Sequence, residues 1–233
     1  MEQDAQENVY RKTAGIAGII TIIMGVVLAG AFPVSSPKMP EGFFTPIIAF
    51  EFIETTTETK ELLAWDNTSQ RTELIAAMRL GIKLDYVFMS AYTMFLGLFS
   101  WVCYKISKQR KYVLGVVVAP IVWVADSIEN FQLLYIMTNL LAGESISSEL
   151  ELLSISTWIK WGGIALIFSL LVPYLWKGGL LSKGTAFMAI LSVFFAVIAF
   201  FDRSVVNEML SLSVILVFVG LILFCFTNNQ TEA

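Results

Sequence analysis

The chain has 233 residues, of which 57% are hydrophobic and 15% are charged, and its mean hydropathy is +0.74. A soluble domain has about 45–50% apolar and about 25% charged residues, so this composition excludes a soluble protein and predicts an all-α membrane protein. The net charge of −4 gives no reason to expect a nucleic-acid partner. The sequence has no histidine and no pair of closely spaced cysteines, so we expect no zinc site of the usual kind, no cysteine metal site and no cofactor. A divalent cation held by carboxylates alone stays open.

The first apolar segment, residues 14–32, follows Arg11 and Lys12 and ends at Pro33. Basic residues before an apolar core also fit a signal peptide, but this core is longer than the ~7–15 residues of such a segment. We therefore expect an uncleaved first span, with a cleaved signal peptide as the alternative.

The longest polar connection follows and includes an expected interfacial segment at residues 42–65. Its apolar part is too short to cross a bilayer and is interrupted by Glu51. Asn67, Thr68 or Ser69 can cap a helix that begins near Gln70 and continues into the second span.

Five more apolar segments complete a predicted bundle of about six transmembrane helices, which forms one integral membrane domain over residues 1–233. These spans cover about residues 81–104, 112–137, 157–176, 185–201 and 208–226. Aromatic residues near the span ends are expected to be interface anchors, namely Trp101, Tyr104, Trp158, Trp161 and Trp176.

Lysine and arginine in the short loops predict the orientation. The loop between the second and third spans holds four of them and no acid, whereas the loop between the third and fourth spans holds acids only. With six spans, both termini are then expected in the cytoplasm of a bacterial cell, with the protein in the inner membrane.

Asp126, Glu129 and Asn130 interrupt the third apolar span. Their spacing of i, i+3 and i+4 places all three on one face of a helix. Ionisable side chains at such depth are rare and usually face the bundle interior or a water-filled cavity. This face is therefore the first candidate site.

Three further candidates come from other segments. Asp85 lies near the start of the second span, Tyr92 shares its helix face, and Glu51 lies in the interfacial segment. The predicted orientation places all of them toward the outside. We therefore expect them to form one outward-facing acidic pocket with the third-span residues.

Four short stretches carry a resemblance: Phe50-Glu51, Leu62-Leu63-Ala64-Trp65, Leu84-Asp85-Tyr86-x-Phe88 with Tyr92, and Asp126-x-x-Glu129-Asn130. In this order they resemble a group of uncharacterised small multi-pass bacterial membrane proteins that has no assigned activity. The similarity covers about residues 45–135. It implies that the acids of these stretches and Asn130 belong to one set, and it implies no chemistry.

Three classes of function fit these residues. The preferred one is binding or transport of a proton, a cation or a small amphiphile by a protein whose main partner is the lipid bilayer. The second is an intramembrane enzyme that uses Asp/Glu acid–base or Mg²⁺-assisted chemistry on a lipid or isoprenoid. The third is a structural or assembly protein whose acids only lock helix register, paired with Arg79, Lys160 or Arg203.

Overall fold

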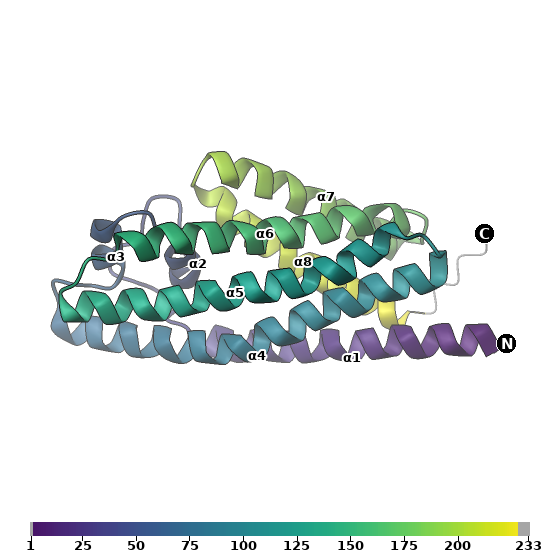
Figure 1. Ribbon diagram of the computed structural model, residues 1–233, viewed down its shortest axis with the longest axis horizontal. Helices are drawn as coiled ribbons and strands as arrows, with labels where there is room; N and C mark the ends of the chain where they lie inside the picture. Colours follow the sequence, from purple (N-terminus) through teal and green to yellow (C-terminus); the bar gives the residue numbers. More distant parts are fainter. Residues whose placement is uncertain (1, 228–233) are drawn as a thin grey trace.

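The computed structural model describes residues 2–227, and within this range all regular structure is helical. Six helices are long and apolar enough to cross a membrane, which confirms the predicted multi-pass architecture. They lie side by side as a bundle (Figure 1). In chain order they are α1 (Glu2–Ala31), α4 (Thr68–Ser107), α5 (Lys111–Ala142), α6 (Ser147–Leu175), α7 (Leu180–Phe201) and α8 (Val205–Phe226). The polar tail expected after residue 227 lies outside the described residues.

Several helices are longer than the spans predicted for them, and α4 is the clearest case. Its N-cap is Asn67, whose side-chain oxygen accepts a hydrogen bond from the amide of Gln70 at 3.2 Å, as expected. The helix then runs for 40 residues to Ser107, and the C-cap residue Lys108, which has φ +57°, ends it. At 1.5 Å per residue, α4 is about 60 Å long, roughly twice the thickness of the hydrocarbon core. One part of α4 therefore extends beyond the bilayer.

The segment expected at residues 42–65 contains two short helices, α2 (Pro46–Glu51) and α3 (Thr56–Leu62). A proline occupies the first turn of α2, and Thr55 caps α3 by accepting a hydrogen bond from the amide of Glu58 at 3.1 Å. Both lie at the end of the bundle away from the chain termini (Figure 1). Because α2 contacts α5, α6 and α8, this connection is part of the packed bundle.

Small residues allow the helices to approach closely. A β-carbon placed on Gly18 of α1 would lie 2.4 Å from Ile222 of α8, and one placed on Gly220 of α8 would lie 2.3 Å from Thr185 of α7. Glycine at these contacts is typical of helix packing in lipid, where there is little hydrophobic drive between helices. The first span is thus packed into this bundle, and its retention as an uncleaved helix stays a prediction.

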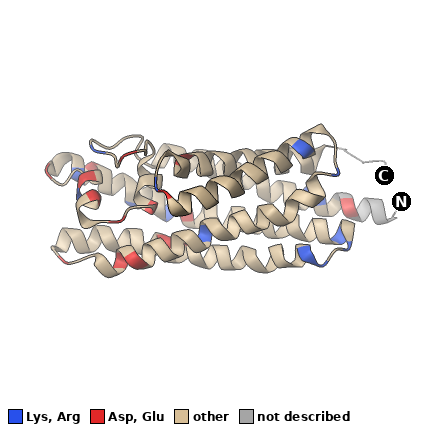
Figure 2. Cartoon of the chain, turned by 90° about the horizontal axis from the view of Figure 1, so that it is seen from above, with Lys and Arg blue, Asp and Glu red and all other residues tan. Residues whose placement is uncertain are grey.

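The acidic residues are distributed unevenly along the bundle. Figure 2 shows Lys and Arg at both ends, and at the end that holds the chain termini they occupy the α4–α5 and α6–α7 turns. Apart from the first part of α1, Asp and Glu lie toward the opposite end, with α2 and α3 (Figure 2). This distribution agrees with the loop charges that predict the orientation, but the side of the membrane on which each end lies stays a prediction.

Candidate functional site

The side chain of Lys160, in α6, lies at the centre of the acidic candidates. Its ammonium donates to a carboxylate oxygen of Glu51 in α2 at 2.8 Å and to one of Glu129 in α5. An oxygen of Asp126, also in α5, lies 3.7 Å from the same nitrogen. Lys160, Asp126 and Glu129 are 5%, 2% and 1% exposed, so this is a buried ionic cluster.

Two helical faces with the same spacing build this cluster. On α5, Asp126, Glu129 and Asn130 project from one face, as their spacing predicts, and all three are buried. On α6, Thr157, Lys160 and Trp161 repeat the i, i+3, i+4 spacing, and they too are buried. The cluster thus forms where these two faces meet.

The second face also holds α2 in place. The indole nitrogen of Trp161 donates to Glu51 at 3.1 Å, and the hydroxyl of Thr157 donates to the backbone carbonyl of Glu51 at 3.2 Å. Together with Lys160, these residues fix both the main chain and the side chain of Glu51. Trp161 was expected to be an interface anchor, and this prediction is wrong because its ring is buried and its N–H needs the carboxylate.

A second set of hydrogen bonds joins α4 to α5. The phenol of Tyr92 donates to Asp126 at 2.5 Å, and the amide nitrogen of Asn130 donates to Asp85 at 2.6 Å. The amide of Asn130 also lies 3.7 Å from the sulfur of Met89. Asp85 therefore belongs to the same polar layer, but it meets the cluster through Asn130 and makes no ion pair with Lys160.

The six sequence candidates therefore converge. Four of them are buried, namely Tyr92, Asp126, Glu129 and Asn130, and Glu51 lines a cavity. That cavity, of about 100 Å³, is formed by α2, α6, the end of α7 and Arg203. Inside the cluster, the second carboxylate oxygen of Glu129 is buried without a hydrogen-bond partner. A buried polar atom of this kind requires an explanation, such as an unseen water or a bound proton.

Of the three basic residues suggested as partners for the acids, only Lys160 enters the cluster. Arg79 donates to the hydroxyl of Thr138 at 3.1 Å. Arg203 pairs with Glu58 of α3, lies 3.6 Å from Glu54 and donates to the backbone carbonyl of Phe52 at 3.2 Å. Arg203 therefore holds the α2–α3 connection against the start of α8.

The electrostatic environment of Glu51 differs from that of an ordinary surface glutamate. Burial raises the pKa of Glu51 above its usual value of 4.5, and the nearby Lys160 opposes this effect without cancelling it. Among residues 2–227, no group of three or more His, Cys, Asp and Glu side chains has an arrangement that fits a metal ion. The point where the carboxylates converge is instead occupied by the ammonium of Lys160.

No family model, curated protein sequence or solved structure matches this chain. The resemblance to small bacterial membrane proteins therefore stays a prediction.

Proposed function

We propose that the buried cluster around Lys160 binds and transfers protons, and that the protein is a binding or transport protein of the membrane that uses this step. The observation that carries the proposal is a charge imbalance. Glu51, Asp85, Asp126 and Glu129 lie in one polar layer, and Lys160 is its only basic side chain among the described residues.

The repulsion between the excess negative charges determines how many carboxylates of the cluster hold a proton. Two like charges about 4 Å apart repel by about 4 kcal/mol at the effective dielectric constant of about 20 that suits protein sites. One ammonium neutralises one carboxylate, so full ionisation would leave three negative charges in a layer where Asp126 and Glu129 are buried and the other two acids are half-buried. Retaining protons costs less than burying these charges, which supports a cluster that holds at least one proton at neutral pH.

The contacts suggest a route for the proton. Glu51 lies between the cavity beside α7 and the ammonium of Lys160, and Lys160 contacts Glu129 and Asp126 in turn. Tyr92, which donates to Asp126, extends this chain into α4. Neighbouring groups with different proton affinities are the arrangement that proton transfer needs.

The position of Lys160 favours a proton over a bound metal cation. A cation held by these carboxylates would have to displace the ammonium, which already supplies the positive charge. A small cationic or amphiphilic ligand would enter by way of Glu51, because this carboxylate lines the cavity beside α7.

The test is proton flux into liposomes that contain the purified protein and an internal pH-sensitive dye. We expect flux under an imposed pH gradient, and its loss in Glu51→Gln, Asp126→Asn and Glu129→Gln. The matched control is Glu151→Gln, because Glu151 is an exposed acid of α6 outside the cluster. Infrared spectroscopy should also show a protonated carboxyl band that disappears in one of the three variants. Absence of both the flux and the band would overturn the proposal.

A structural role is the second candidate, because the single side chain of Lys160 joins its own helix, α6, to both α2 and α5. In this case the three substitutions should lower the stability of the protein, and no flux should appear in the unaltered chain. Retained stability together with lost flux would support the proton site instead.

A further inference from the structure

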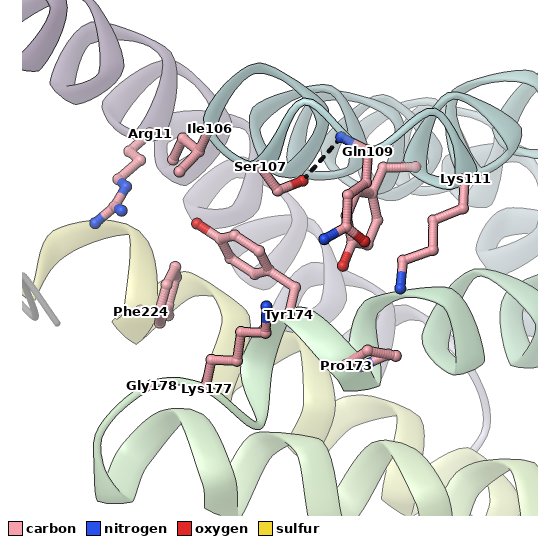
Figure 3. Close-up of a pocket in the computed structure, with 11 residues that line it drawn as sticks. Arg11, Ile106, Ser107, Gln109, Lys111, Pro173, Tyr174, Lys177, Gly178 and Phe224 are labelled. Atoms are coloured by element: carbon pink, nitrogen blue, oxygen red, sulfur yellow. Dashed lines mark hydrogen bonds between the residues drawn. The ribbon is translucent and has the colours of Figure 1, made fainter. Parts of the chain in front are cut away.

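A second cavity, of about 200 Å³, lies at the opposite end of the bundle from α2 and α3. Residues from α1, α4, α5, α6 and α8 and from the turns between them line it. Three of these residues are basic, namely Arg11, Lys111 and Lys177, and none is acidic. Figure 3 shows Arg11 and Lys177 on either side of Tyr174, whereas Lys111 lies farther along the cavity, beyond Gln109.

Arg11 has an incomplete set of partners in this cavity. Its guanidinium lies over the ring of Phe224, 5.4 Å from the ring centre, and its Nε is buried without a hydrogen-bond partner. Arginine has five N–H donors in a planar fork that matches the oxygens of a phosphate. A buried N–H left unpaired in such a place points to an acceptor that comes from outside the chain.

The size and composition of the cavity restrict the ligand. Sites for drug-sized molecules have about 300–1,000 Å³, whereas a water molecule takes about 30 Å³ in the liquid, so this cavity suits a group of several heavy atoms. The lining holds two lysines, one arginine and no acid, which favours an anion, and Glu7 of α1, whose charge acts on Tyr174, offsets only one of the three positive charges. The hydroxyls of Tyr112 and Tyr174 add further polar groups.

We propose that this cavity binds a phosphate group that carries a net negative charge. The group could belong to an anionic lipid headgroup or to a soluble phosphate, because both present the same oxygens. The surrounding turns carry further lysines and arginines, which raise the local concentration of either anion. This site is separate from the proton site and does not depend on it.

The test uses the full chain in nanodiscs of zwitterionic phosphatidylcholine. Anionic phosphatidylglycerol is added to the lipid mixture in one arm and inorganic phosphate to the buffer in the other, and binding is measured by native mass spectrometry and by thermal shift. The variants are Arg11→Gln and Lys177→Gln. Each has a matched control at the same end of the bundle, Lys12→Gln and Lys183→Gln, which remove the same charge from exposed positions outside the cavity.

We expect each cavity variant to weaken anion binding about tenfold or more, whereas the controls change it little. Retention of phosphatidylglycerol without an effect of inorganic phosphate would identify a lipid headgroup, and the reverse result would identify a soluble phosphate. An effect of both would support a site that recognises the phosphate oxygens from either source. Lys177 is exposed, so its variant should fold even if Arg11→Gln does not. If the variants and the controls lose anion binding equally, binding depends on the general surface charge and the proposal is wrong. The absence of binding of either anion would also overturn the proposal.

Discussion

The ammonium of Lys160 donates to Glu51 at 2.8 Å, and this ion pair joins the middle of a long helix to a six-residue helix 109 positions earlier in the chain. Glu51 is 11% exposed and Lys160 is 7% exposed at the side chain. The contact therefore places the end of α2 directly on the buried cluster, and it makes this helix part of the candidate site.

Lys160→Met should destabilise the protein by about 3–5 kcal/mol near neutral pH, because it leaves buried carboxylates without their cation. The loss should shrink as the pH falls, since protonation removes the uncompensated charge. Thermal unfolding in detergent at several pH values measures this. Lys83→Met, which removes an exposed lysine from α4, is the control and should stay within about 0.5 kcal/mol of the unaltered protein. A pH-independent loss would contradict this interpretation of the cluster.

Tyr92→Phe should cost about 1–3 kcal/mol, because it leaves a buried oxygen of Asp126 without the donor that lies at 2.5 Å. Tyr86→Phe on the same helix is the matched control. The hydroxyl of Tyr86 reaches only the carbonyl of Ser127, at 3.4 Å, so its loss should have little effect. Chemical denaturation gives the free energy of unfolding of both variants. Equal losses would show that the hydrogen bond from Tyr92 to Asp126 contributes no more to stability than the one from Tyr86.

Glu58 should stabilise the fold only above acidic pH. Hydrogen bonds from Arg203 hold the pKa of Glu58 below its usual value of 4.5. Because the folded value is lower than the unfolded one, this stabilisation is present above about pH 4.5 and is lost as the pH falls through the folded value. Glu58→Gln should remove that acid-side loss in a pH series of unfolding temperatures. Glu61→Gln, which affects an exposed pair with Lys38, should leave the loss in place.

Glu51 should give the opposite pH dependence. Its folded pKa is raised by burial, so the folded state binds a proton more tightly than the unfolded chain does. Its contribution to stability is therefore full below about pH 4.5 and declines as the pH rises from there through the folded value. Glu51→Gln should flatten this decline, because a neutral amide does not titrate. A variant that keeps the same slope as the unaltered protein would contradict the assignment.

The bundle and half of the site followed from local patterns. Apolar runs of this length predict the spans because a helix satisfies all of its backbone hydrogen bonds within one segment in lipid. The face of Asp126, Glu129 and Asn130 followed from helical spacing, and the structure places it where two helices meet. Such a pattern fixes which residues share a face, and burial cost indicates that the face points inward.

The other half of the site depends on which helices are neighbours, and local spacing does not contain that information. Thr157, Lys160 and Trp161 have the same spacing as the acidic face, and this signal could have identified them as its partner. Trp161 was instead interpreted as an anchor because the expected span began at residue 157, whereas α6 begins at Ser147. Because α6 begins ten residues before the expected span, Trp161 lies well inside the helix and not at its first turn.

The contact between α5 and α6 that positions the cluster can be tested with two adjacent glycines. A β-carbon on Gly163 would lie 2.4 Å from a methyl group of Val122, which is fully buried in α5, whereas one on Gly162 would meet nothing within 4 Å. Gly163→Ala should therefore force the helices apart and cost about 1–3 kcal/mol. Gly162→Ala should be neutral or stabilise by up to about 1 kcal/mol, because alanine favours helix. Displacement of α6 should also weaken the hold of Lys160 on Glu129, so Gly163→Ala should lower proton flux while Gly162→Ala retains it. Equal stability of the two variants would show that α5 and α6 are not packed as closely as this structure has them.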